Sequence, residues 1–503
     1  SLHDALPIYL TSADIDVQQE LSNSNDGEHV IELDGETQSY SNLGITKTGD
    51  SDGEDADFYG ENSAVFATNS ANLTLTKSLI ITDGAHANAI FSYGEGTIIN
   101  VSDSVIITKA NNSGGLMTTG GGTMNATNLT IETAGGSSAA IRSDRGGGTV
   151  NVTNGTYTAS GRGSPAIYST ADITVSSAHL ESKTAQGIVI EGKNSVTLNN
   201  CELVADNNTH NSTNSNNYEA IMIYQSGSGD ASEGKGSFTI SGGSITNANG
   251  DIFFVNNTIA DITLKDASIT NNDSDGVFLR AEAAGWGSEG SNGGQVTLNA
   301  SAQVIDGDML VDEVSHLNLY LTDGSSFTGS INPDGEEGEV YVELTEGSVW
   351  TLTGDSYITS LTCDADSIDL NGYTLYVNGE AYEEGNASSG EAIEVTVSSS
   401  GHGGGGTPPD GNGGPGGGGV PQKDAGEAHG PVPGLLLCPH EGHDHRHDKG
   451  GPLVLEPPGG LRQCGVRPRP GAVRRGGKVY RHPRQVKGRS LLRPFPPSPP
   501  GEI

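Results

Sequence analysis

The feature that most constrains how this chain can fold is an internal repeat. An eight-residue pattern, apolar–x–apolar–x–x–small–x–apolar, recurs with starts 26, 25, 26, 23, 23, 42 and 24 residues apart. A second short apolar run follows each copy, and Gly, Asn, Ser and Asp fill the space between. Repeats of this length are typical of stacked architectures. The copies begin at Leu73, Ile99, Met124, Val150, Ile173, Val196, Phe238 and Ile262.

The repeat predicts a parallel β-helix. Alternation with period two makes a strand with one inward face, and the small residue suits a corner where the chain bends into the next strand. One unit cannot bury its apolar face alone, whereas stacked units bury a continuous axial core. Neighbouring coils would then lie about 4.8 Å apart as parallel ladders. We therefore predict an all-β solenoid.

Proline and cysteine usage agree with this prediction. Pro165 and Pro333 are the only prolines between residues 8 and 407, which fits because every coil needs its N–H groups for the next coil. Cys201 holds the small position of its copy, so we expect a buried thiol rather than a reactive one, and the same for Cys363. Two cysteines in 1–420 are too few for a disulfide framework.

The 42-residue step predicts an ordinary coil that carries two polar insertions, 206–217 and 226–236. Such insertions project from solenoids as loops. The chain as a whole divides into six predicted segments. They are a non-native leader that resembles a translated sequencing-adapter junction (1–8), N-terminal strands with an acidic loop (9–60), β-helix repeats (61–295), C-terminal coils and a cap (296–390), a Gly-rich linker (391–420) and a disordered tail (421–503).

The tail differs from the body in composition. Residues 1–420 carry 11 Lys and Arg against 56 Asp and Glu, whereas 421–503 carry 14 against 7 and hold 15 of the 21 prolines. We interpret the tail as out-of-frame translation, with a genuine disordered segment as the alternative. A third reading is a metal site, because Cys438, His440, His443, His445 and His447 cluster there.

The body carries a net charge of −45, which limits the partners we expect. It argues against nucleic acid, because few cations are present to neutralise phosphates. It favours solubility and cation binding. The sequence holds no run of about 18 apolar residues, so no membrane span is predicted.

Residues 315–378 contain longer, more regular strands, "HLNLYLTDGSSFTGSI", "VYVELTEGSVWTLTGDSYITSLTC" and "DSIDLNGYTLYVNG". Here the sequence resembles the right-handed β-helices of bacterial surface adhesin-like and autotransporter-passenger proteins. The resemblance covers roughly residues 40–400 and is architectural. It implies a right-handed, single-stranded parallel β-helix and an exported protein displayed at the cell surface or secreted.

Our functional hypothesis is a non-catalytic, monomeric, adhesin-like protein that binds a polysaccharide, a surface glycan, or a host or neighbouring surface protein. The first alternative is a polysaccharide lyase or hydrolase acting on acidic glycans, and the second is a structural surface stalk. The body lacks the Asp-Asp pair and the Arg-x-Lys of polygalacturonase-like enzymes, and its Gly-His-Gly at 401–403 falls in the linker.

Four residues are candidate ligand contacts. Trp286 lies in a Gly-rich stretch where an aromatic ring can stack on a sugar or anchor an interface, although it can also pack over a coil edge. Arg142, Asp144 and Arg145 bring two of the eleven body cations together beside a carboxylate. The alternative interpretation of these three residues is a solvent-exposed corner of a coil with surface ion pairs.

No cofactor is required by this hypothesis, but calcium is the ion for which a site is predicted. Asp50, Asp52, Asp55 and Asp57 supply hard oxygen ligands within residues 49–60. The spacing does not match an EF-hand loop, because Gly53 comes too early. The alternative is a solvated acidic loop.

Overall fold

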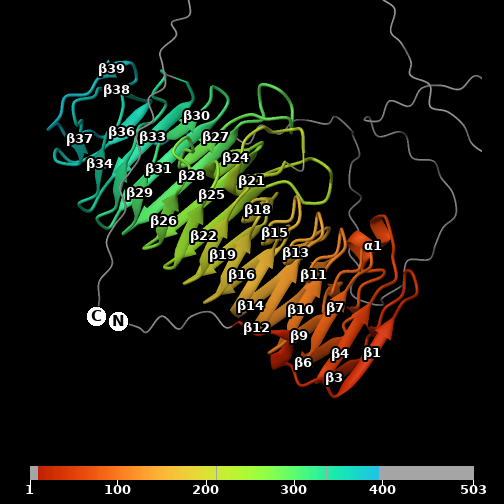
Figure 1. The fold of residues 1–503 in the computed structure, drawn as a ribbon. Coiled ribbons are helices and arrows are strands. Elements are labelled where there is room, and N and C mark those ends of the chain that lie inside the picture. The colour runs from red at the N-terminus through yellow and green to blue at the C-terminus, as the bar shows by residue number, and fades with distance from the viewer. Residues whose placement is uncertain (1–8, 211, 336, 396–503) are drawn as a thin grey trace, which may run out of the picture. The chain divides into compact units, whose positions relative to one another are not determined.

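Parallel strands of successive repeats lie side by side along the molecule (Figure 1). The computed structural model describes residues 9–210, 212–335 and 337–395, and in them the chain is nearly all-β. The tail 421–503, with its histidine cluster, and most of the linker lie outside the described residues. Large parallel sheets repeat at the spacing of the sequence pattern, which agrees with a β-solenoid.

One parallel sheet of eleven strands receives the second apolar run of each repeat within the described ranges. Its members follow in chain order: β2 (Ile31–Asp34), β5 (Val65–Thr68), β8 (Ile90–Tyr93), β11 (Leu116–Thr119), β13 (Ile141–Ser143), β15 (Ile167–Ser169), β18 (Ile188–Glu191), β21 (Glu219–Tyr224), β24 (Asp251–Asn256), β27 (Leu279–Ala281) and β30 (Met309–Val311).

A larger sheet consists of two ladders that the long strands β12 (Gly122–Thr133) and β14 (Gly148–Ala159) join. The other strands of the first ladder are β3 (Thr37–Ser41), β6 (Asn72–Thr76), β9 (Ile98–Ser102), β16 (Asp172–Ser176), β19 (Ser195–Asn199), β22 (Lys235–Ser241), β25 (Thr258–Lys265), β28 (Gly294–Ser301), β31 (His316–Thr322), β33 (Glu339–Leu344) and β36 (Ser360–Thr362). Those of the second ladder are β1 (Gln19–Asn23), β4 (Leu43–Lys47), β7 (Leu79–Thr82), β10 (Val105–Thr108), β17 (His179–Ser182), β20 (Glu202–Ala205), β23 (Ser244–Asn247) and β26 (Ser268–Asn271).

Short strands complete the C-terminal part. They are β29 (Val304–Asp306), β32 (Ser326–Thr328), β34 (Val349–Thr351) and β37 (Ile368–Asp369) in one sheet, and β35 (Ser356–Ile358), β38 (Leu375–Val377) and β39 (Glu380–Ala381) in another. The pairing of β38 with β39 is antiparallel. Helical segments in the described parts are the 3₁₀ turn η1 (Ser12–Asp14) and α1 (Glu54–Tyr59), and neither could span a membrane.

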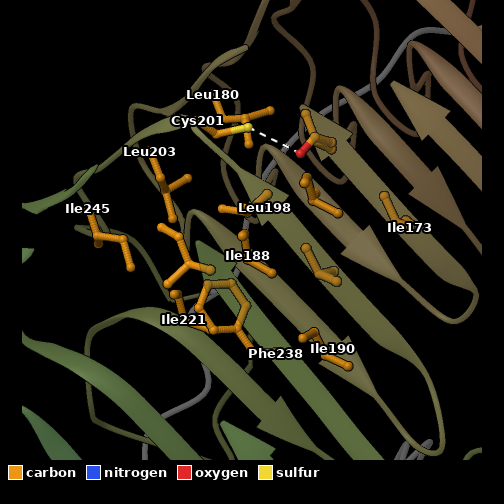
Figure 2. Packing of buried hydrophobic residues seen from close by; sticks show 14 of the residues in the cluster. Ile173, Leu180, Ile188, Ile190, Leu198, Cys201, Leu203, Ile221, Phe238 and Ile245 are labelled. Carbon is orange, nitrogen blue, oxygen red and sulfur yellow. Dashed lines mark hydrogen bonds between the residues drawn. The ribbon is translucent and has the colours of Figure 1, made fainter. Parts of the chain in front are cut away.

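Each repeat sends its apolar positions into one shared core (Figure 2). In the repeat that begins at Ile173, this residue comes from the first ladder, Leu180 from the second and Ile188 from the eleven-stranded sheet. All three are fully buried, and burying each such side chain contributes roughly 1.5–3 kcal/mol. Cys201 is buried beside them, and its thiol donates to the carbonyl of Val175 at 3.3 Å.

The bend between the two ladders differs in detail from the prediction. We expected the corner at the small residue, but the residue just before it takes the left-handed conformation, with φ between 48° and 64°. Asn, Asp and Gly adopt this conformation more readily than other residues, which explains their frequency at this position. These corner residues are Lys77, Asp103, Asn128, Asn154, Ser177, Asn200, Gly242 and Asp266.

Candidate functional site

The outward face of the eleven-stranded sheet carries large side chains in register. Tyr168 of β15 pairs with Val189 of β18, which pairs with Met222 of β21, and Met222 pairs with Phe254 of β24. These residues alternate with core residues, so they point away from the core. Val189, Met222 and Phe254 are nevertheless buried, because loops cover this face.

Two of the covering loops contact each other directly. The backbone N–H of Gly285 donates to the carbonyl of Asn214 at 2.7 Å, which joins the loop 283–294 to the insertion 206–217. Asn292 fixes the first loop from within, since its side-chain amide donates to the carbonyls of Ala284 and Trp286 at 2.7 and 2.8 Å. The indole of Trp286 is thereby held over the sheet.

A cavity of about 130 Å³ lies between these loops and the sheet. Its lining combines aromatic and apolar side chains with amides and hydroxyls. The described lining residues are Gly163, Pro165, Tyr168, Gln186, Val189, Asn207, Thr209, His210, Ser212, Ser215, Asn217, Glu219, Met222, Tyr224 and Trp286. We call this the Trp286 pocket.

The aromatic wall of the Trp286 pocket is held in place from behind. The rings of Tyr224 and Trp286 meet edge to face with centroids 5.1 Å apart. The hydroxyls of Tyr168 and Tyr224 both donate to one oxygen of the buried Glu191, and Ser226 donates to the other oxygen. Burial raises the pKa of both tyrosines, so their hydroxyls stay neutral donors. This network fixes the orientation of two aromatic rings.

Glu219 is the one acidic side chain in the described lining of the Trp286 pocket. It is only 2% exposed, and Gln186 donates to its Oε1 at 2.7 Å, while its Oε2 has no partner among the residues that the structure describes. Burial raises the pKa of Glu219 to about 8, and the neighbouring carboxylate of Asp251 adds to this rise. Glu219 is therefore predominantly protonated at pH 7 in the free protein. Asp251 itself forms an ion pair with Arg280 at 2.6 Å.

The candidate ligand residues from the sequence fall in different places. Trp286 lines the pocket, where its contact with a ligand stays a prediction. Arg142 lies beside Tyr168 on the same face and forms a buried ion pair with Asp144 at 2.6 Å. Arg145 binds Glu54 of α1 and Asp230 of the 226–236 insertion, and its guanidinium lies 3.9 Å from the ring centroid of Phe58. These two arginines are thus engaged with the protein itself.

Two of the four aspartates of the predicted calcium site are already bound to other parts of the protein. The segment 49–60 is not wholly a loop, because α1 forms inside it. Asp57 contacts His86 at 2.7 Å, and Asp50 accepts from the backbone N–H of Ala85 at 2.8 Å. In the described part of the chain, His, Cys, Asp and Glu form no group of three or more that could hold a metal. Calcium binding that involves Asp52 and Asp55 stays a prediction.

A second cavity, of about 190 Å³, is dominated by carboxylates. Burial raises the pKa of Glu337 there, and the nearby charges of Glu313 and Asp312 raise it further. The guanidinium of Arg280 also lines this cavity, but Asp251 and Glu282 already bind it. The mixture of aromatic and neutral polar groups that marks the Trp286 pocket is not found in its described lining.

Sequence reasoning missed Glu219, Tyr168 and Tyr224. A signal was present for the first, since "EAIMIY" (219–224) starts an otherwise apolar strand with a carboxylate. Tyr168 ends the apolar run at 166–168 and Tyr224 follows the run at 221–223, and aligning the runs would have placed both tyrosines on one face.

Comparison with known proteins gave no match: no family model, no curated protein and no solved structure matches this chain.

Proposed function

We propose that this protein is a non-catalytic, adhesin-like protein, secreted or held at the cell surface, that binds a glycan in the Trp286 pocket. The observation that carries the proposal is the composition of that pocket. Trp286 and Tyr224 offer aromatic surface, while Gln186, Asn207 and Asn217 offer side-chain amides. Sugars present apolar ring faces and hydroxyls, so a wall of aromatic and amide groups complements them.

The proposal includes the finer features implied by the resemblance. The stacked parallel ladders support a single-stranded β-helix, for which we propose the right-handed sense, acting as a monomer. The acidic body and the polar outer faces of the ladders support display in an aqueous environment. The glycan of a host or neighbouring surface is the partner that follows from this placement. A structural stalk would not require a pocket of this composition.

Glycoside hydrolysis is the second candidate, and one observation favours it. Glu219 and Asp251 pair in register on adjacent strands, whose backbones lie about 4.8 Å apart, and hydrolases act through a pair of neighbouring carboxyl groups. Against it, the carboxylate oxygens of Asp251 accept from Arg280 and from the backbone N–H of Val277. Among the described lining residues, Glu219 is the one carboxyl group that reaches the pocket. We therefore rank binding above hydrolysis.

The test is glycan-array screening of the full chain, followed by calorimetry on the best neutral, acidic and amino-sugar oligosaccharides. Truncation of a central aromatic contact costs about 2 kcal/mol or more, so Trp286→Ala should weaken binding at least about thirtyfold. Tyr373→Ala is the matched control, because Tyr373 is 43% exposed and lies outside the pocket. Release of reducing or unsaturated ends from any oligosaccharide would replace this proposal with the enzyme. Binding that Trp286→Ala leaves unchanged would remove the pocket from it.

A further inference from the structure

One atom of the Trp286 pocket has a hydrogen-bonding capacity that the protein leaves unused. Gln186 occupies Oε1 of Glu219, while Oε2 is buried and has no partner among the described residues. A buried oxygen without a partner costs free energy, so such an oxygen on a residue that lines a cavity is a candidate contact for a ligand group. Glu219 lines the cavity, although Oε2 itself is covered in the free protein, so a ligand group in the pocket reaches this oxygen once the carboxyl group turns towards it.

Charge decides which ligand group fits this oxygen. No Lys or Arg is found in the described lining of the pocket, and the nearest guanidinium felt by Glu219, that of Arg280, is bound to Asp251 and Glu282. The body carries a net charge of −45, which attracts cations and repels acidic glycans. Aromatic faces add to the attraction for a cation, as the rings of Trp and Tyr do for ammonium groups.

We propose that the Trp286 pocket recognises amino sugars, with the ammonium group of one sugar residue bound to Oε2 of Glu219 and the ring of that residue against Trp286. This inference rests on the proposed function, since it names the class of glycan that the same site takes. The cavity of about 130 Å³ is smaller than the roughly 300–1,000 Å³ of sites that enclose drug-sized ligands. One sugar residue or its substituent enters, and the rest of the glycan stays outside.

Binding by this route moves one proton. In the free protein Glu219 holds its proton at pH 7, because burial raises its pKa to about 8. A ligand amine that arrives protonated pairs with the carboxylate while the carboxyl group gives its proton to the buffer, whereas an amine that arrives neutral takes that proton itself; a carboxylate–ammonium pair remains in both cases. Asp251 and Arg280 also face Glu219, and His210, Tyr168 and Tyr224 are the other ionisable side chains in the described lining.

The experiment compares oligomers of β-1,4-linked glucosamine with fully N-acetylated oligomers of equal length, by calorimetry on the full chain. We expect the free-amine oligomer to bind at least about tenfold more tightly, because only it completes the charge pair. Glu219→Gln should abolish this preference while leaving weaker binding of both oligomers. Glu233→Gln is the matched control, since Glu233 is exposed in the 226–236 insertion and should keep the preference.

Proton release gives a readout that does not depend on a variant folding well. At about pH 5.5, where both the amines of the oligomer and Glu219 carry their protons, calorimetry in two buffers with different ionisation enthalpies should show close to one proton released per free-amine oligomer, and none for the acetylated one. Glu233→Gln, outside the described pocket lining, should leave the release intact.

The outcomes separate the two proposals. Equal affinity for both oligomers, or binding without proton release, overturns the amino-sugar inference and leaves glycan binding standing. A lysine-rich peptide that binds as tightly as the glucosamine oligomer also overturns it, because the sugar ring would then contribute nothing. Failure to bind any glycan overturns the proposed function itself.

Discussion

At the scale of single residues, Glu219 shows how a residue that lines a cavity can work against the stability of its own fold. Its carboxyl group is buried, and the negative charge it would carry in water is disfavoured there. Most buried polar atoms have a hydrogen-bond partner, but among the described residues Oε2 of this carboxyl group has none. At neutral pH the folded protein therefore keeps a proton on Glu219 that a solvent-exposed carboxyl group would lose.

This predicts a pH dependence of stability. The pKa of Glu219 is raised to about 8 in the folded state, so the unfolded chain loses the proton first as pH rises. Between about pH 4.5 and 8 the folded state binds more protons than the unfolded state, and the free energy of unfolding falls with rising pH. Glu219→Gln should flatten this slope. At pH values above 8 it should also raise the midpoint temperature of thermal unfolding.

The measurement is differential scanning calorimetry of both proteins from about pH 3.5 to about pH 9. Below about pH 4, where Glu219 is mostly neutral in both states, the two proteins should have similar stability. Above pH 8 the variant should be more stable by an amount on the order of a few kcal/mol. A parallel pair of curves would contradict the assignment of the slope to Glu219.

At the scale of elements, the pocket depends on loops rather than on strands. The loop 283–294 approaches the insertion 206–217 so closely that a Cβ at Gly285 would lie 2.8 Å from Cα of Asn214. Backbone at this distance cannot move aside without separating the two loops. Asn292 holds the same loop by its two hydrogen bonds to backbone carbonyls.

Gly285→Ala should therefore abolish glycan binding and leave the stacked sheets intact. We expect the emission of Trp286 to shift towards that of a solvent-exposed indole, while the cooperative unfolding of the sheets changes by less than about 1 kcal/mol. Ser288→Ala, in the same loop and outside the pocket lining, is the control. Loss of the whole β-sheet signal in circular dichroism would show that the loop contact supports the fold instead.

At the scale of the whole molecule, the sequence repeat predicted the parallel ladders but not the pocket. A pattern such as that from Ile173 to Leu180 states which side chains face the core, and the structure pairs its strand residue for residue with the next. The pocket instead joins Tyr168 to Trp286 through insertions with no periodic pattern. The helix α1 was missed for a related reason, because "EDADFY" carries no helical apolar periodicity.

The charge of the body leads to a prediction at the same scale. Self-repulsion within a net charge of −45 opposes folding, so raising the salt concentration should raise the midpoint of thermal unfolding. If the segment 49–60 binds calcium, millimolar calcium should raise it further than magnesium at equal ionic strength.

The double variant Asp52→Asn with Asp55→Asn should remove only the additional rise in the unfolding midpoint that calcium produces over magnesium. Thermal shift measurements in matched salts test both statements. Equal shifts with calcium and magnesium would leave screening alone as the effect of divalent ions. If sodium chloride leaves the midpoint of thermal unfolding unchanged, repulsion between the negative charges of the body does not limit its stability.

Gln186 and Glu219 belong to adjacent repeats and meet only because nothing stands between them. A new repeat placed between these two would leave every core position filled, yet it would carry the amide away from the carboxyl group. The proposed recognition would thus be lost through a change that the fold tolerates.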